Sequence, residues 1–202
     1  MKYSIVFPGQ GSQKLGMLSE LASEASIIES TFAGASDVLG LDLWEVCQND
    51  PASILNQTEI TQPALLSASV AVWRFWQSET HLSPSILAGH SLGEYSALVC
   101  AESLDFRDAI RVVHERGKLM QAAVPEGHGK MAAIIGLTAK DINTICDDVM
   151  AEKGVVSAAN YNSLSQTVIA GDAEAVQKAM EYCQGAGAKK VLLLNVSVPS
   201  HC

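Results

Sequence analysis

The pentapeptide Gly89-His90-Ser91-Leu92-Gly93 fits the pattern G-x-S-x-G. In that pattern small residues allow a sharp turn from a strand into a helix, and the serine hydroxyl is exposed above the helix N-terminus. Residues 86–88 have the apolar character of the preceding strand, and residues 94–101 that of the following helix. We therefore predict that Ser91 is a nucleophile able to carry an acyl group, while a tight turn with an incidental serine is the alternative.

A second glycine-rich turn, Gly9-Gln10-Gly11-Ser12-Gln13, follows a strand expected over residues 3–7. It is neither G-x-G-x-x-G nor a P-loop, which disfavours a cradle for nucleotide phosphates. Its glycines would instead let a backbone N–H approach a reacting carbonyl. Such an amide would complete an oxyanion hole with the amide that follows the nucleophile, although an ordinary glycine-rich turn fits the sequence equally well.

An arginine falls among apolar residues on the helix expected over residues 105–123. At 100° per residue one face of this helix carries Phe106, Ala109, Val112, Val113, Met120 and Ala123, with Arg116 near its centre. The opposite, solvated face carries Arg107, Arg111, His114 and Lys118. A guanidinium on an apolar face needs an anion to offset its desolvation. Arg116 is therefore either a bidentate clamp for a substrate carboxylate, a partner in a structural ion pair, or a side chain that reaches out to solvent.

A serine nucleophile also needs a general base. The candidates are His81, His90, His114, His128 and His201. We favour His201 because it follows the last predicted strand, where the chain is expected to return to the first domain. A position in an ordinary surface loop is the alternative.

The composition limits the possible partners. With 13 Lys and Arg against 22 Asp and Glu, the net charge is −9, which disfavours binding to nucleic acid or to an anionic membrane. The sequence has no apolar run of membrane-spanning length and no signal peptide, so we expect a cytoplasmic protein. The five cysteines are scattered without C-x-x-C spacing, which predicts buried thiols rather than disulfides or a zinc site.

The order of predicted elements indicates an α/β protein with two domains. Strands over 3–7 and 85–88 are each followed by helical patterns, and a nearly all-apolar helix over 62–78 should lie against a parallel sheet covered on both faces. After a breaker cluster at residues 125–129 the order becomes βαββαβ, with strands expected over 131–136, 155–160, 166–171 and 190–195 and helices over 139–150 and 173–185. This is the split βαβ arrangement of ferredoxin-like folds. We assign 1–126 with 197–202 to a hydrolase-like domain and 127–196 to an inserted ferredoxin-like subdomain.

Taken together, these motifs resemble the malonyl-CoA:acyl carrier protein transacylases, the acyltransferase family of fatty acid and polyketide synthesis. The resemblance covers residues 3–202 and follows the order of the family's blocks. These blocks are Phe7-Pro8-Gly9-Gln10-Gly11-Ser12-Gln13, Thr61-Gln62-Pro63-Ala64-Leu65, Ala88 to Ala97, Arg116-Gly117, Asn162-Ser163 with Gln166, and Val198-Pro199-Ser200-His201.

The resemblance implies a role for each site residue. Ser91 would be the acylated nucleophile and His201 the general base, while Arg116 would bind the malonyl carboxylate. The amides of Gln10 and Leu92 would form the oxyanion hole, with Gln10 also contacting the substrate. The acyl group would pass from malonyl-CoA to the phosphopantetheine thiol of acyl carrier protein, with no metal or redox cofactor, in a monomer. Family members continue well beyond the histidine, so the resemblance also implies a chain truncated at its C-terminus and a first domain that is incomplete there.

Two other functions fit parts of the pattern. A serine thioesterase or esterase would share the serine and the histidine, but it would have no use for Arg116 and would need an acid between them. A truncated chain could also be an inactive fragment that binds the carrier protein. Lys189-Lys190, the only adjacent basic pair, with Lys178 on the preceding helix, is the candidate docking surface for an acidic carrier protein, although these lysines could simply be solvated.

Overall fold

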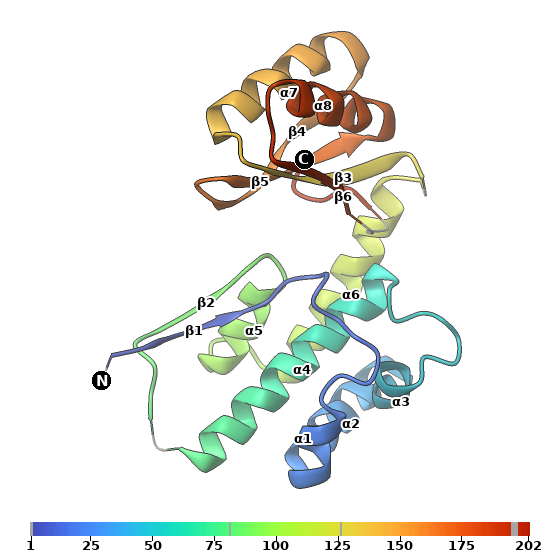
Figure 1. Cartoon of the computed structure of the whole chain (residues 1–202). Coiled ribbons are helices and arrows are strands. Elements are labelled where there is room, and N and C mark those ends of the chain that lie inside the picture. Colours follow the sequence, from blue (N-terminus) through green and yellow to red (C-terminus); the bar gives the residue numbers. More distant parts are fainter. Residues whose placement is uncertain (1, 81, 126, 195–197) are drawn as a thin grey trace. The chain divides into compact units, whose positions relative to one another are not determined.

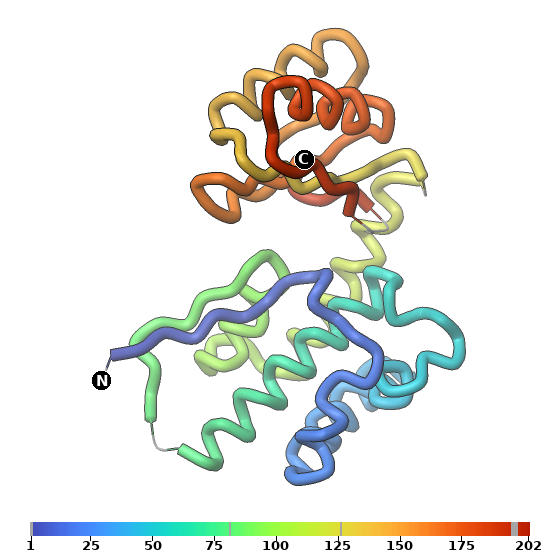
Figure 2. The backbone as a smooth tube through the Cα atoms, in the orientation of Figure 1, coloured from blue at the N-terminus to red at the C-terminus, as the bar shows by residue number. Residues whose placement is uncertain are grey.

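In the computed structural model, which describes residues 2–80, 82–125, 127–194 and 198–202, the chain divides into two units, Met1–Leu119 and Met120–Cys202. The first unit holds β1 (Ser4–Phe7) and β2 (Ile86–Gly89), which pair in parallel from Ser4 opposite Ile86 to Phe7 opposite Gly89. Figure 2 shows β1, in blue, running beside β2, in green, although the two are far apart in the sequence. The predicted parallel pairing is confirmed.

Six helices labelled in Figure 1 belong to the first unit or begin in it. They are α1 (Ser19–Glu24), α2 (Ile27–Leu39), α3 (Leu43–Gln48), α4 (Thr58–Glu79), α5 (Gly93–Cys100) and α6 (Phe106–Ala123). Helix α5 packs on both strands, and α4 packs on α2 and α5. The strands alternate in exposure, so that Val6 and Ile86 are open to solvent. Within the described residues only one face of this sheet is covered, which corrects the expectation of two covered faces.

Helix α4 begins four residues before its predicted start, and its sequence explains how deeply it is buried. Twelve side chains between Thr58 and Ala71 are buried, as the nearly all-apolar pattern predicts. From Val72 onward the side chains of the helix are less buried: Val72 is exposed, and Trp73 and Trp76 are half-buried. The prediction of burial on several sides is therefore correct for the N-terminal part of α4 and wrong for its last two turns.

The second unit has the predicted βαββαβ order. Its elements are β3 (Gly129–Ile135), α7 (Ala139–Lys153), β4 (Val156–Ser163), β5 (Gln166–Asp172), α8 (Ala173–Gly185) and β6 (Lys190–Leu193). The strands form an antiparallel sheet in the order β4-β5-β3-β6. Both helices pack on this sheet and bury a core that includes Ile134, Ile142 and Ile169. This is the ferredoxin-like arrangement, and the predicted subdomain type is confirmed.

The predicted domain limits stay a prediction. Residue 126, at the first limit, and residues 195–197, where the chain was expected to return to the first domain, lie outside the described residues. The end of the last predicted strand, at residue 195, lies outside them as well. Within the described ranges, no helix combines the length and the apolar character that crossing a membrane requires.

Four of the five cysteines are buried, as expected, but Cys202 is exposed, so the prediction is wrong for that residue. Burial raises the pKa of the thiols of Cys47, Cys100 and Cys146 to about 12. These thiols are therefore protonated at neutral pH and are not nucleophiles.

Candidate active site

Ser91 lies on the turn between β2 and α5 with a φ of 54°, in the left-handed region that non-glycine residues rarely adopt. Backbone hydrogen bonds fix this turn. The N–H of His90 donates to the Phe7 carbonyl over 3.1 Å, and the N–H of Gly93 donates to the His90 carbonyl over 2.9 Å. The serine is thus held in a strained conformation of the kind found at functional sites, as the G-x-S-x-G pattern predicts.

The two glycines of the pentapeptide are required by close backbone packing. A Cβ on Gly89 would overlap the backbone of Gly93. A Cβ on Gly93 would overlap the Phe7 carbonyl and lie 2.9 Å from the Pro8 carbonyl oxygen. Neither position has space for a side chain, and this brings the loop after β1 directly against the serine turn.

The loop after β1 brings the second predicted oxyanion donor to this turn. An added Cβ on Gly9 would lie 2.7 Å from the His90 carbonyl oxygen, so the two loops are in contact. Within the part of the chain that the structure describes, the backbone N–H groups of Gln10 and Leu92 have no acceptor. The Gln10 side chain is held aside, because its Nε2 donates to Thr58 Oγ1 over 3.2 Å. Two unused amides on contacting loops are what an oxyanion hole needs.

Arg116 reaches the serine from α6. Its Nη2 donates to Ser91 Oγ over 3.2 Å, and its Nη1 donates to Gln62 Oε1 over 2.7 Å. Its guanidinium carbon lies 5.9 Å from the centre of the Tyr95 ring. In the described ranges, the ion pairs involve Arg107, Arg111 and Lys118, and none involves Arg116.

The environment of Arg116 therefore does not fit two of the three alternatives that the sequence left open, the structural ion pair and the side chain that reaches out to solvent. Its hydrogen-bond partners are the neutral side chains of Ser91 and Gln62, so it is not part of a structural ion pair. It is half-buried and directed at the serine rather than at open solvent. A half-buried guanidinium with neutral partners is suited to bind an anion beside Ser91.

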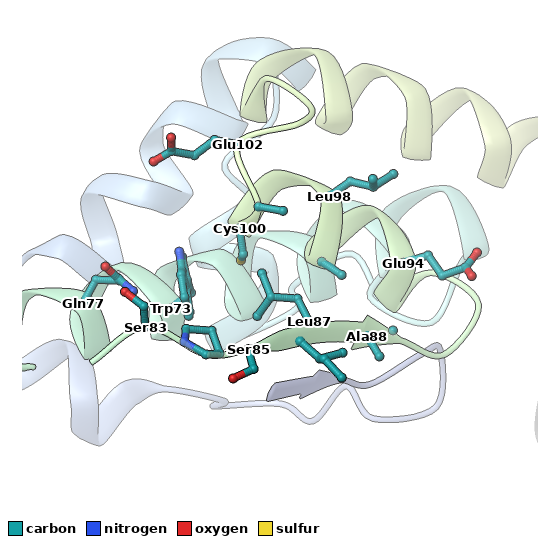
Figure 3. A pocket seen from close by; sticks show the side chains of 15 residues that line it. Trp73, Gln77, Ser83, Ser85, Leu87, Ala88, Glu94, Leu98, Cys100 and Glu102 are labelled. Carbon is teal, nitrogen blue, oxygen red and sulfur yellow. The ribbon is translucent and has the colours of Figure 1, made fainter. Parts of the chain in front are cut away.

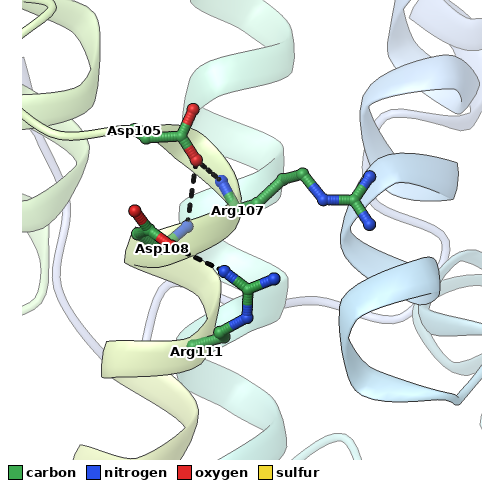
Figure 4. A network of polar contacts seen from close by, with 4 residues as sticks. All are labelled: Asp105, Arg107, Asp108 and Arg111. Atoms are coloured by element: carbon green, nitrogen blue, oxygen red, sulfur yellow. Dashed lines mark hydrogen bonds and ion pairs between the residues drawn. The ribbon is translucent and has the colours of Figure 1, made fainter.

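The polar end of α6 shows why this helix starts where it does. Asp105 Oδ1 accepts the backbone N–H of Arg107 over 2.8 Å and that of Asp108 over 3.1 Å, which caps the first turn. Figure 4 shows this cap together with the exposed ion pair between Arg111 and Asp108. Arg107 and Arg111 are exposed, as predicted for the solvated face.

The predicted faces of α6 need three corrections. Val112 and Ala123, which were predicted on the apolar face, are exposed, while Ile110 and Gly117 are buried. The buried face of α6 is therefore displaced by about one residue position from the predicted apolar face. His114 is half-buried rather than solvated, and its Nδ1 lies 2.9 Å from the Glu59 carbonyl oxygen. Gly117 allows this approach, since a Cβ there would lie 2.7 Å from the Glu59 nitrogen.

His201 belongs to the second unit, where it is exposed and has a φ of 65°. The residues before it are anchored to the ferredoxin-like sheet. Val198 is buried, an added Cβ on Gly129 would overlap the Pro199 ring, and Ser200 Oγ lies 3.4 Å from Met131 Sδ. Among the other candidates, His90 and His128 are exposed, and His81 lies outside the described residues. The role of His201 as a base stays a prediction.

One cavity of the first unit lies at a different place from the serine site. It has a volume of about 890 Å³ and lies along β2 and α5. Figure 3 shows its lining, which includes Trp73, Leu87, Leu98 and Cys100. Neither Ser91 nor Arg116 contributes to it, and the Cys100 thiol is protonated.

In the described ranges, no three His, Cys, Asp or Glu side chains gather as a metal site requires, and the expected absence of a metal or redox cofactor stays a prediction.

Several site residues were missed in the sequence. Gln62 binds Arg116, Thr58 binds Gln10, and Tyr95 lies beside the guanidinium. Gln62 could have been found, because a glutamine in a nearly all-apolar stretch of helix must satisfy its amide when it is buried. Thr58 and Tyr95 gave no comparable signal, since their contacts depend on how α4 and α5 pack.

Comparison with known proteins gives one consistent result. The model of the acyl transferase domain family matches residues 4–202. A malonyl CoA-acyl carrier protein transacylase of Escherichia coli strain K12 is 57% identical over 201 residues, which cover 100% of this chain and 65% of that protein. The solved transacylase of Coxiella burnetii is 50% identical with a TM-score of 0.97, and the match covers 100% of this chain and 64% of the other.

A third relative was solved with a partner. It is a malonyl-transacylase in complex with a type II polyketide synthase acyl carrier protein, 57% identical with a TM-score of 0.97 over 100% of this chain and 65% of that one. The chain thus spans just under two thirds of the length of these relatives. Their structures confirm the predicted α/β fold class. Because the family model and these relatives match along the whole chain, the chain belongs to the acyl transferase domain family.

Proposed function

We propose that this protein transfers a malonyl group from malonyl-CoA to the phosphopantetheine thiol of an acyl carrier protein, through an ester on Ser91. The observation that carries the proposal is the guanidinium of Arg116, which contacts Ser91 Oγ and has only neutral partners. A cation in that position suits an acyl group that ends in a carboxylate. The relatives described above are malonyl CoA-acyl carrier protein transacylases, and this supports the same substrate and partner.

In the first half of the proposed reaction, Ser91 Oγ attacks the thioester carbonyl of malonyl-CoA while His201 takes the hydroxyl proton. The backbone N–H groups of Gln10 and Leu92 donate to the oxyanion of the tetrahedral intermediate. As the C–S bond breaks, His201 gives the proton to the departing CoA thiolate. The malonyl group is then held as an ester on Ser91.

In the second half, the phosphopantetheine thiol of the carrier protein occupies the position that CoA left. His201 takes the thiol proton, the thiolate attacks the ester carbonyl, and the same two amides stabilise the oxyanion. The C–O bond breaks and His201 returns the proton to Ser91 Oγ. Throughout both halves Arg116 holds the malonyl carboxylate, so the acyl group stays oriented in a site of fixed geometry.

Arg116 can exchange its present contacts for a carboxylate without losing its support. Its Nη1 is anchored by Gln62, a fully buried residue of α4, while its Nη2 contacts Ser91 Oγ. A guanidinium has five N–H donors, so it can keep Gln62 and still bind a carboxylate through its remaining donors. The serine hydroxyl is then released to attack.

The carrier protein would approach the basic pair on the second unit. Lys189 and Lys190 are exposed, and Lys190 begins the edge strand β6. Lys178, on α8, has its ammonium 4.8 Å from the Tyr182 ring centre. These cations offer an acidic partner a local attraction that the overall charge of −9 does not. The monomeric state and the cytoplasmic location stay predictions.

Incubation with radiolabelled malonyl-CoA tests the proposed function against its alternatives. A stable ester that is passed on to added acyl carrier protein supports the transferase. Release of free malonate without transfer would identify a serine hydrolase instead. Binding of the carrier protein with neither product would identify an inactive binding fragment. The Ser91→Ala variant is the control for label bound elsewhere.

A further inference from the structure

Helix α4 contains a proline at its sixth residue. In an α-helix the N–H of residue 63 would donate to the carbonyl of residue 59. Pro63 has no N–H, so the Glu59 carbonyl lacks its helical partner. An unpaired carbonyl in a partly buried position is unfavourable, and another donor must take the missing place.

The donor comes from α6. The Nδ1 of His114 lies 2.9 Å from the Glu59 carbonyl oxygen. A carbonyl oxygen can only accept, so Nδ1 must carry the proton in this bond. We propose that the Nδ1–H of His114 replaces the N–H that Pro63 lacks, and that this bond holds α6 where Arg116 reaches Gln62 and Ser91. His114 is then a positioning residue for the anion-binding arginine.

The surrounding contacts explain why one hydrogen bond can set the place of Arg116. His114 and Gly117 are three positions apart on α6 and both meet Glu59, the first through its ring and the second through close backbone packing. Arg116 lies between them and binds Gln62, three positions after Glu59 on α4. The two helices are therefore fixed to each other within one turn on either side of the arginine.

The effect of removing the His114 side chain should depend on whether residue 63 is a proline. Pro63→Ala gives residue 63 an N–H that can donate to the Glu59 carbonyl, which makes the histidine unnecessary. His114→Ala removes the donor and leaves the carbonyl unpaired only when the proline is present. His114→Asn places an amide N–H near the position of Nδ1 and is the conservative variant. His128→Ala, at an exposed histidine of the second unit, is the matched control.

Urea unfolding of the whole chain gives the first readout, and it does not depend on any activity. We expect His114→Ala to raise the unfolding equilibrium constant roughly fivefold in the wild-type background, and by less than about twofold in the Pro63→Ala background. His114→Asn should retain most of the stability, and His128→Ala should change little. An equal loss from His114→Ala in both backgrounds would overturn the inference.

Nitrogen NMR of labelled histidine gives a second readout in the wild-type protein. The His114 resonances, assigned by their loss in His114→Ala, should show a protonated Nδ1. In Pro63→Ala that preference should weaken. A neutral ring with its proton on Nε2 in the wild-type protein would contradict the hydrogen bond directly, whatever the variants do.

The acylation of Ser91 gives the third readout, and this part rests on the proposed function. His114→Ala should raise KM for malonyl-CoA roughly fivefold and leave acylation by acetyl-CoA unchanged, since only the malonyl group uses Arg116. Either Pro63→Ala or His114→Asn should restore the malonyl reaction. Equal losses with both acyl groups would contradict the positioning role. If the wild-type protein takes no malonyl label, the proposed function fails, and the unfolding cycle and the NMR still decide the hydrogen bond.

Discussion

The Nη2 of Arg116 lies 3.2 Å from the Oγ of Ser91, so the first unit holds a cation directly beside a serine in a strained backbone conformation. The guanidinium is held by Gln62 and has no acid partner among the described residues. In the proposed function, this relationship would place the carboxylate of the acyl group beside the ester on Ser91.

Arg116→Ala should reverse the acyl preference. Loss of the charge-assisted bonds to the malonyl carboxylate should lower the rate of malonyl transfer by about 10- to 100-fold. Transfer of acetyl should be retained or should increase, because no unpaired cation remains beside the serine. Competition between malonyl-CoA and acetyl-CoA in one reaction measures the ratio. A parallel decline of both acyl groups would show that the arginine is only structural.

Gly93→Ala should destabilise the first unit by roughly 2–4 kcal/mol, because its Cβ would overlap the Phe7 carbonyl and meet other backbone atoms at short range. Gly34→Ala in α2 is the matched control. Its Cβ would meet only Phe106 Cε1 at 3.7 Å, so the change should be neutral or stabilise by about 0.5–1 kcal/mol. Urea unfolding measures both. Equal stabilities for the two variants would mean that the serine turn can relax around a side chain.

The local motifs of the fold could be predicted because a short stretch of sequence specifies each of them. The pentapeptide around Ser91 and the breaker cluster before β3 specify backbone conformations directly. The βαββαβ order follows from the alternation of apolar and helical patterns in the second unit. The predicted bounds of α8, at Ala173 and Gly185, agree with the structure.

Contacts between helices could not be predicted in the same way. The burial of His114 depends on Gly117, which lets α6 approach α4 to within backbone contact of Glu59. A helical wheel treats His114 as one polar residue among others, and it does not show that Pro63 has left a carbonyl open. The contact between Gln62 and Arg116 could not be predicted either, because the two residues are 54 positions apart in the sequence.

His201→Ala should slow both halves of the reaction, because one base serves the serine and then the thiol. The expected loss is about 100- to 10,000-fold in each half, the usual range for a general base. Rapid-quench measurement of Ser91 acylation, and separately of transfer from preformed ester to carrier protein, gives the two rates. His128→Ala should leave both unchanged. Slowing of only one half would rule out a shared base.

Lys189→Glu with Lys190→Glu should raise KM for the acyl carrier protein several-fold at low salt and less at high salt, because screening weakens the attraction between charges. KM for malonyl-CoA should change much less. A matched double variant, Lys2→Glu with Lys14→Glu at two exposed lysines of the first unit, carries the same change in net charge. If the two double variants raise KM equally, the effect comes from total charge and the docking surface lies elsewhere.

The proposed reaction depends on acylation of the Ser91 Oγ. The protein should be incubated with malonyl-CoA, digested, and mapped by mass spectrometry, with Ser91→Ala treated in parallel. We expect one malonyl group on the peptide that contains Ser91, its loss when acyl carrier protein is added, and no malonyl group anywhere in Ser91→Ala. Malonyl label that persists in Ser91→Ala, or that maps to another residue of the wild-type chain, would contradict the assignment of Ser91 as the nucleophile.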